Sequence, residues 1–229
     1  MKRFFAICAL LMIPAIYGNA GSLDLNGFAG AGNYNVSVTS YAERRFKTVY
    51  KQQYDFSCGS AALASLLTFH YEDEVNEQSI FIDMFENGDQ EKIKEQGFSL
   101  LDMKNYLERR GYRSDGFKIE LDHLLTANAP AITIINDKGY LHFIIIKGLN
   151  KRQVLVGDPA VGVKIIPREK FEEMWAGRIL FLIHDKQDIA AKYFQNETEW
   201  AARSAPLGTA VDRASLAAFN MLLPGPWDF

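Results

Sequence analysis

The sequence predicts an α+β fold in which N-terminal helices pack on an antiparallel β-sheet. Helical segments come first, from residue 57 to residue 111, and runs rich in β-branched residues follow from residue 131. Short polar turns separate these runs, which is typical of strands that pair as hairpins. Helices and strands that are segregated along a chain favour an α+β rather than an α/β domain.

The composition agrees with a globular protein that has a sizeable core. Of 229 residues, 48% are hydrophobic and 23% are charged, which excludes a disordered or fibrous chain. The formal net charge of −3 supplies no basic surface for a phosphate backbone. Nucleic acid is therefore not an expected partner.

The first twenty residues have the pattern of a secretory signal peptide. Lys2 and Arg3 precede an apolar run over residues 4–17, and small residues lead to Ala20. The run is shorter than the about 20 residues that span a bilayer, which favours cleavage after Ala20 over a membrane anchor. We therefore expect a periplasmic protein that has no integral membrane segment once the signal is removed.

The predicted signal peptide changes how the two cysteines are interpreted. Only Cys8 and Cys58 occur, and Cys8 lies within the predicted signal peptide. In a compartment where disulfides form, Cys58 would have no internal partner. Such a thiol is buried and inert, paired with another chain, or retained for its reactivity.

The chain divides into four predicted segments. A Gly- and Asn-rich stretch and weak alternation through Val36, Val38 and Tyr41 indicate a loose arm followed by a strand. Helix-like stretches at 189–203 and 210–222 either pack on the domain or dock a partner. The segments are a signal peptide (1–20), an N-terminal arm (21–47), a globular domain (48–186) and a C-terminal extension (187–229).

Three helices are predicted in the first half of the domain. One begins after Ser57, an N-cap residue type, and is so rich in Ala and Leu that we expect it to be buried nearly all round. A short helix is expected over residues 78–85, in an acidic stretch whose charges indicate a solvated surface. The third begins at a capping box formed by Ser99 and Asp102 and stops at Gly111.

Four strands are predicted after Pro130. Three consecutive strands, over residues 131–136, 140–149 and 153–159, are joined by tight turns. A further strand is expected near residues 178–185.

Cys58 is the candidate nucleophile because it lies in the first turn of a predicted helix. Unpaired backbone N–H groups and the helix dipole favour an anion there, and the thiolate is the nucleophilic form of cysteine. Gly59 would let a substrate or a neighbouring strand approach the sulfur closely. For an average cysteine, a small buried apolar residue is the competing interpretation.

His142 is the candidate general base among four histidines. His70 lies on the same helix as the thiol but about 18 Å along it at about 1.5 Å per residue, so it cannot touch the sulfur. His123 falls on a helix face, and His184 follows an apolar strand near its end. His142 opens a strand directly after a turn, and it is interpreted as structural unless a third group holds its tautomer.

Asp158 supplies that third group. The strands around residues 141–147 and 153–157 form a predicted hairpin, which places the start of the first beside the end of the second. His142 and Asp158 are therefore predicted neighbours. Pro159 ends the strand, and an ordinary Asp-Pro turn is the competing interpretation.

Gln52 is the candidate oxyanion donor. Its carboxamide can donate an N–H toward a developing oxyanion, alongside the backbone N–H of Cys58. Gln53 is the rival for this role, and an exposed loop glutamine is the competing interpretation.

In this order and at this spacing, Gln52, Cys58-Gly59, His142 and Asp158-Pro159 resemble the bacteriocin-processing cysteine peptidases, family thirty-nine of the papain-like clan. The resemblance covers residues 48–186, including the helix over residues 97–112. It implies a papain-like cysteine peptidase fold with Cys58 as nucleophile, His142 as general base and acid, Asp158 as its orienter and Gln52 as oxyanion donor.

Two departures from that family shape the expected function. Ser57 replaces an Asp that often precedes the cysteine, which alters local charge without removing a catalytic group. The best-known members are domains of ABC exporters that cut double-glycine leaders in the cytoplasm, whereas this chain shows an export signal. It is more similar to stand-alone periplasmic members encoded with functional-amyloid export systems of the Fap type.

The sequence therefore predicts a periplasmic cysteine endopeptidase that hydrolyses peptide bonds of an exported protein, with functional-amyloid secretion components as candidate substrates or partners. No cofactor and no metal are expected, because His and Cys never cluster at ligand spacing. Two alternatives stay open: a papain-like peptidoglycan amidase or transpeptidase, and a non-catalytic chaperone or docking factor for an exported chain.

Overall fold

The computed structural model describes residues 22–26, 33–37, 40–54 and 56–203. The chain divides after Arg44 into two compact units. The predicted signal peptide (1–20), the predicted strand residue Val38 and the helix-like stretch 210–222 lie outside the described residues.

The first unit contains an antiparallel pair of strands, β1 (Ser22–Asn26) and β2 (Asn33–Ser37). The strand predicted in this region is β2, whereas β1 is not predicted by the Gly- and Asn-rich sequence. The predicted alternation extends too far, because Tyr41 begins helix α1 (Tyr41–Arg45). Ser40 and Glu43 form a reciprocal capping box there, which starts a helix instead of prolonging a strand.

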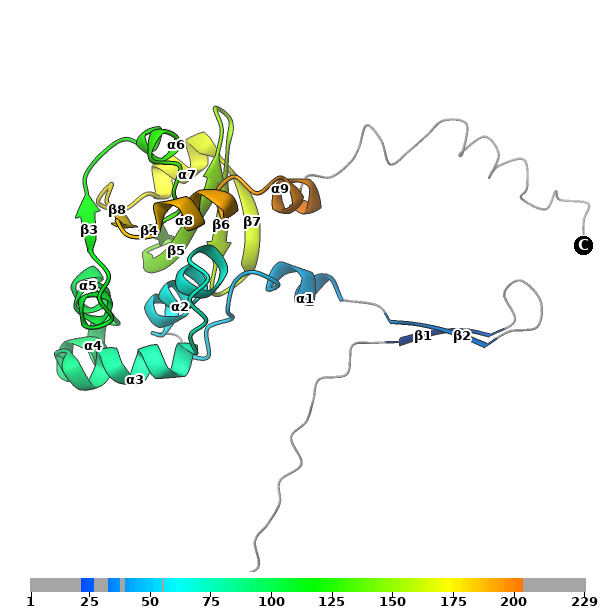
Figure 1. Cartoon of the computed structure of the whole chain (residues 1–229), viewed down its shortest axis with the longest axis horizontal. Coiled ribbons are helices and arrows are strands. Elements are labelled where there is room, and N and C mark those ends of the chain that lie inside the picture. Colours follow the sequence, from blue (N-terminus) through cyan, green and yellow to red (C-terminus); the bar gives the residue numbers. More distant parts are fainter. Residues whose placement is uncertain (1–21, 27–32, 38–39, 55, 204–229) are drawn as a thin grey trace, which may run out of the picture. The chain divides into compact units, whose positions relative to one another are not determined.

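The second unit is built on a six-stranded antiparallel sheet with the order β3-β8-β4-β5-β6-β7 (Figure 1). The three predicted consecutive strands are β4 (Ala131–Asp137), β5 (Tyr140–Leu149) and β6 (Gln153–Asp158). The fourth, β8 (Leu180–Ile183), is shorter than predicted. The two edge strands, β3 (Ser114–Phe117) and β7 (Gly162–Pro167), are not predicted.

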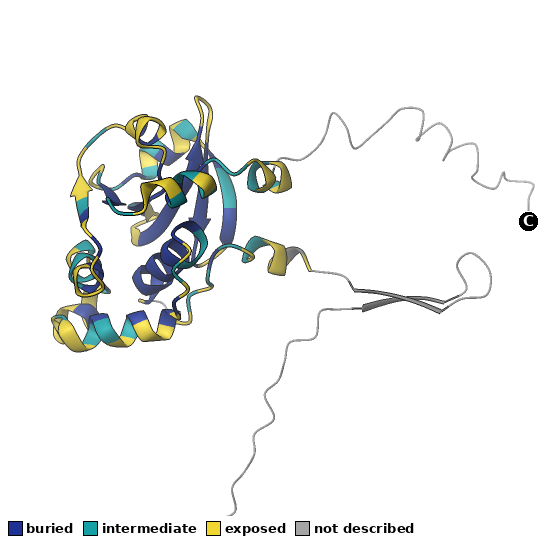
Figure 2. Ribbon diagram, in the orientation of Figure 1, coloured by how far each residue is buried: buried dark blue, intermediate teal, exposed yellow. Residues whose placement is uncertain are grey.

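The long helix α2 (Cys58–His70) is buried along nearly its whole length, as its Ala- and Leu-rich sequence predicts (Figure 2). It packs against strands β4 and β5 and against helices of the same unit. The burial of a helix with no polar face fixes its N-terminus against the sheet. The other helices of this half are α3 (Glu77–Asn87), α4 (Gln90–Gln96) and α5 (Leu100–Arg109), of which α4 is not predicted.

Helix α5 begins at the predicted capping box. The backbone N–H of Asp102 donates to Ser99 Oγ at 3.2 Å, and the backbone N–H of Ser99 donates to Asp102 Oδ2 at 2.8 Å. After the helix, Gly111 has φ of 81°, the left-handed conformation that favours glycine. Two short helices, α6 (His123–Ala127) and α7 (Arg168–Met174), occupy later connections.

Replacing Ser99 by alanine should lower the free energy of unfolding by about 1 kcal/mol, the usual cost of losing an N-cap side chain. Urea unfolding of wild type and Ser99→Ala would measure the difference. Ser79→Ala is a matched control, because the Ser79 hydroxyl donates to a backbone carbonyl inside the first turn of α3 and caps no N–H group. Equal losses in the two variants would contradict a capping role for Ser99.

The polar stretch predicted as helix over residues 189–203 is two helices, α8 (Gln187–Tyr193) and α9 (Glu197–Arg203). Gln195 separates them with φ of 60° and pairs with strand β5. Its backbone N–H donates to the Lys147 carbonyl at 2.9 Å, and its side chain exchanges two hydrogen bonds with the Leu149 backbone. The β5–β6 register shifts between Ile146 and Gly148, so Lys147 is the bulged residue to which the C-terminal segment attaches.

The bulge also buries a cation. The Lys147 side chain is 1% exposed, and its Nζ lies 2.6 Å from Glu199 Oε1 on α9 and 2.7 Å from Thr48 Oγ1. Residues 187–203 of the C-terminal extension therefore pack on the domain, which is one of the two roles that the sequence left open.

Candidate active site

Cys58 is the first residue of α2 and is 7% exposed. Ser57 precedes the helix as predicted, but its side chain makes no cap hydrogen bond. Its Oγ instead accepts from the Tyr54 N–H at 3.1 Å and donates to the Tyr54 carbonyl at 3.0 Å. The first N–H groups of α2 therefore lack a side-chain cap beside the Cys58 sulfur, which is the electrostatic setting that stabilises an anion.

Gly59 allows close packing next to the sulfur. A Cβ added there would lie 3.0 Å from Met103 Cε and 3.1 Å from Phe98 Cβ. Of the substrate and the neighbouring strand that the sequence suggested, strand β5 does come close, with Phe143 Cδ2 at 3.5 Å, but the two nearest atoms belong to α5 and to the segment before it.

His142 and Asp158 lie beside each other at the end of the β5–β6 hairpin, as predicted. The ladder pairs Ile145 with Gly157, so the same register would set Asp158 opposite Ile144, and His142, two residues further along β5 on the same face, is its diagonal neighbour. His142 Nε2 and Asp158 Oδ1 are 2.7 Å apart, and both side chains are nearly inaccessible to solvent. This bond leaves His142 Nδ1 buried without a hydrogen bond to the described part of the chain.

The two buried side chains shift each other's pKa in opposite directions. Burial opposes the charged form of His142, but the hydrogen bond and charge of Asp158 and the neighbouring Cys58 outweigh it and raise the pKa of His142 to about 9. Burial likewise favours the neutral form of Asp158, yet hydrogen bonds from His142 and Lys164 lower the pKa of Asp158 to about 2. The pair is therefore an imidazolium and a carboxylate near neutral pH, with Cys58 close enough to interact with the ring.

Lys164 belongs to the site although sequence reasoning missed it. Its Nζ lies 2.7 Å from Asp158 Oδ2, and the backbone N–H of Ala160 donates to Asp158 Oδ1 at 2.9 Å. The signal available in the sequence was the turn after Asp158, since a second hairpin brings β7 back alongside β6.

Gln52 is tied to the loop that carries Asp158, because its backbone N–H donates to the Pro159 carbonyl at 3.0 Å. Its side-chain Nε2 donates to the Tyr54 carbonyl at 3.3 Å. A carboxamide nitrogen has two N–H donors, so one remains for another acceptor. No contact joins Gln52 to Cys58 among the hydrogen bonds of the described residues.

Glu77 corrects the interpretation of the acidic stretch as wholly solvated surface. It is buried at the start of α3, and burial raises its pKa although the neighbouring Ser57 and Ser60 hydroxyls and the Gln53 backbone oppose this. Its carboxyl group therefore helps to hold the loop that leads into Cys58. Nothing in the spacing of the acidic residues distinguished Glu77 from its exposed neighbours.

The other three histidines lie in settings that differ from that of His142. His70 is buried at the end of α2, where burial and the Lys147 charge hold its pKa well below the usual range. His123 begins α6 and its Nδ1 lies 3.2 Å from the Glu120 carbonyl. His184 follows β8, with Nε2 3.2 Å from Asp115 Oδ2.

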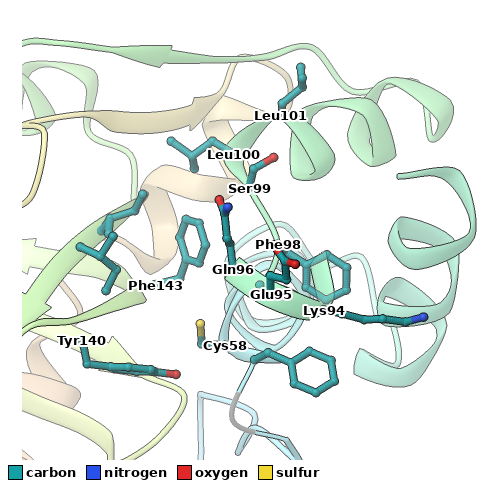
Figure 3. Close-up of a pocket in the computed structure, with 14 residues that line it drawn as sticks. Cys58, Lys94, Glu95, Gln96, Phe98, Ser99, Leu100, Leu101, Tyr140 and Phe143 are labelled. Atoms are coloured by element: carbon teal, nitrogen blue, oxygen red, sulfur yellow. The ribbon is translucent and has the colours of Figure 1, made fainter. Parts of the chain in front are cut away.

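A pocket of about 540 Å³ opens beside the Cys58 sulfur. Figure 3 shows the sulfur between the β5 side chains Tyr140 and Phe143 on one side and the segment that leads into α5 on the other. The wall is largely apolar. Its lining residues are Phe56, Cys58, Lys94, Glu95, Gln96, Gly97, Phe98, Ser99, Leu100, Leu101, Ile134, Tyr140, Leu141 and Phe143.

Neither a metal-binding cluster nor a membrane-spanning helix occurs among the described residues. Three or more His, Cys, Asp or Glu side chains do not gather there in a way that could hold a metal ion. In the same part of the chain, no helix has the length and hydrophobicity needed to cross a membrane.

A cysteine at the start of a buried helix and a His–Asp pair on the facing sheet are the arrangement of papain-like cysteine peptidases, and the fold is theirs. The solved peptidase domain of Streptococcus ComA, a bifunctional ABC transporter involved in quorum sensing, superposes with a TM-score of 0.50 at 20% identity. The match covers 59% of this chain and 96% of that domain. A profile of the Peptidase C39 family matches residues 46–187, and the chain belongs to this family of cysteine peptidases.

Two relatives match over most of their length. A Pseudomonas fluorescens protein described as "Probable functional amyloid protease FapD" is 36% identical over 204 residues, which is 89% of each chain. The Pseudomonas aeruginosa protein of the same description is 36% identical over 182 residues, 80% of each chain. The expected relation to the functional-amyloid branch of the family is therefore confirmed.

Proposed function

We propose that this chain is a periplasmic cysteine endopeptidase that hydrolyses peptide bonds of an exported protein, with functional-amyloid secretion components as the substrate class. The observation that carries the proposal is the His142–Asp158 bond of 2.7 Å at the side of the helix that begins with Cys58. The similarity over 89% of a functional amyloid protease supports the substrate class. The N-terminal signal pattern supports export.

The proposed chemistry has two steps. The Cys58 thiolate attacks the scissile carbonyl carbon, and the His142 imidazolium gives its proton to the leaving amine as the C–N bond breaks. Water then attacks the thioester while His142 takes a proton from it, and the C–S bond breaks, which releases the acid and restores the Cys58 thiolate and the His142 imidazolium. Asp158 holds the ring in one orientation and stabilises its charged form.

The oxyanion of each tetrahedral intermediate needs donors beside the sulfur. The backbone N–H of Cys58 lies at an uncapped helix start, and the second side-chain N–H of Gln52 is the proposed partner donor. The Gln52 backbone bond to Pro159 supports this assignment, because it anchors the glutamine to the turn after Asp158.

The pocket indicates which substrate side chains would fit. Its wall contains Leu100, Leu101, Leu141 and Phe143, of which Leu101 and Leu141 are each at least 60% exposed. Burial of these apolar surfaces against a substrate would be favourable, whereas charged side chains would lose hydration there. The proposed substrate therefore presents apolar side chains next to the cleaved bond.

Mapping of protein N-termini by mass spectrometry tests the proposal. In periplasmic extracts of the native cells, at least one N-terminus should occur with wild type and be absent with Cys58→Ala. A matched His123→Ala variant should retain it, because His123 lies on α6, does not line the pocket beside Cys58, and has its Nδ1 3.2 Å from the Glu120 carbonyl. Identical N-termini with wild type and folded Cys58→Ala would contradict the proposal, and the N-terminus of the mature chain itself tests cleavage after Ala20.

A further inference from the structure

The carboxylate of Asp158 is held on both oxygens. Oδ1 accepts from His142 Nε2 and from the Ala160 N–H, and Oδ2 accepts from Lys164 Nζ at 2.7 Å. A lysine is not needed to orient a carboxylate that already has two donors on one oxygen. The expected effect of Lys164 is therefore on the charge of the His142–Asp158 pair.

The placement of Lys164 follows from two consecutive hairpins. The β6–β7 ladder pairs Asp158 with Gly162, so Lys164 is a diagonal neighbour of Asp158 on one face. His142 approaches the same carboxylate from β5 on the other side. The turn is fixed because Gly162 has φ of 84° and a Cβ there would lie 2.5 Å from the Arg45 carbonyl oxygen.

We propose that Lys164 is a positioning residue of this site, which acts through Asp158 to limit how strongly the carboxylate holds a proton on His142. The inference rests on the proposed function for its catalytic meaning. Lys164 does not line the pocket beside the Cys58 sulfur. It would therefore act on the reaction only through Asp158 on β6 and His142 on β5. Its side chain is 28% exposed, against 4% for Asp158, so the ammonium stays partly hydrated.

The charged and titratable groups around Asp158 come from three elements. His142 approaches from β5, with the Tyr140 ring 5.9 Å from it, Lys164 approaches from β7, and Cys58 of α2 lies beyond the ring. Without Lys164, the carboxylate keeps its bond to His142 but loses its counter-charge. The remaining negative charge then stabilises the imidazolium more strongly, so the proton leaves His142 at a higher pH.

Alkylation of the full chain by iodoacetamide tests this without a peptide substrate. The rate at the Cys58 peptide, followed by mass spectrometry, should show an inflection near pH 9 when the wild-type ring loses its proton. In Lys164→Met this inflection should move up by about 0.5–1 pH unit, the size of one removed charge at a partly screened distance. Lys164→Arg should restore the wild-type value.

Lys104→Met is the matched control, because it removes a lysine–aspartate pair of 2.6 Å that lies between α5 and β3, away from the His142–Asp158 pair. An inflection that is unchanged or lower in folded Lys164→Met, or that moves equally in Lys104→Met, would overturn the inference. The readout is independent of cleavage. If no N-terminus depends on Cys58 but the alkylation inflection still shifts as predicted in Lys164→Met, the proposed function is refuted. The role of Lys164 then remains supported.

Discussion

Replacing His142 by alanine should lower kcat/KM for peptide cleavage by about 10²–10⁴-fold, the usual contribution of a positioned general acid–base. It should also change how Cys58 reacts with iodoacetamide. In wild type the ring has a pKa of about 9 and stays charged at neutral and acidic pH, so a positive charge lies beside the Cys58 sulfur. The variant should lose the part of the alkylation rate at low pH that depends on this charge.

The same charge predicts a pH dependence of stability. Because the folded pKa of His142 lies above its ordinary value of 6.5, its stabilising contribution is complete below pH 6.5 and is lost as the pH rises through about 9. His142→Ala should lack this loss of stability in alkaline solution. His123→Ala should behave as wild type in both measurements, and an alkylation profile unchanged in His142→Ala would rule out a charged His142 beside the thiol.

Replacing Glu199 by alanine should lower the free energy of unfolding by about 3–5 kcal/mol, because it leaves the buried Lys147 ammonium without its acidic partner. Burial already lowers the pKa of Lys147, while Glu199 opposes that shift. Thr48 Oγ1 and the Thr48 carbonyl would remain as its neutral partners. The melting temperature should fall by roughly 6–20 °C for a chain of this size.

Thermal and urea unfolding would measure the effect, with Glu197→Ala as the control. Glu197 is an exposed residue on the same helix, so its loss should cost less than about 0.5 kcal/mol. The double variant Lys147→Met/Glu199→Leu should recover most of the lost stability, since apolar residues of similar volume can replace a buried ion pair. Equal unfolding curves for Glu199→Ala and Glu197→Ala would show that the pair does not attach α9 to the sheet.

The sequence predicts those parts of the fold whose signals are local. The signal lies in the residues of the element itself for the Ala- and Leu-rich helix α2, for the capping box of α5, and for the β-branched strands β4, β5 and β6. The edge strand β3 has the sequence SDGF, which has no apolar alternation, because its pairing with β8 and not its composition makes it a strand. The break at Gln195 depends on a bulge in β5, nearly fifty residues earlier, and no local pattern could predict it.

The candidate site divides in the same way. The hairpin between β5 and β6 connects residues close in sequence, so His142 and Asp158 could be placed together from turn geometry alone. Lys164 required a further hairpin, and the buried role of Glu77 required the tertiary contact between α3 and the loop before α2. Ser57 is the N-cap residue as predicted, but its side chain caps no N–H group, because its hydroxyl forms a local turn with Tyr54 instead.

The packing around Gly59 has a consequence for the entropy of the reaction. A Cβ at Gly59 would lie only 3.0 Å from Met103 Cε and 3.1 Å from Phe98 Cβ, so the backbone next to the residue that carries the sulfur has little room to move. A substrate has to bring its carbonyl to a sulfur whose position is already set. The cost of ordering that half of the reacting pair is met when the chain folds and is not repeated at each turnover.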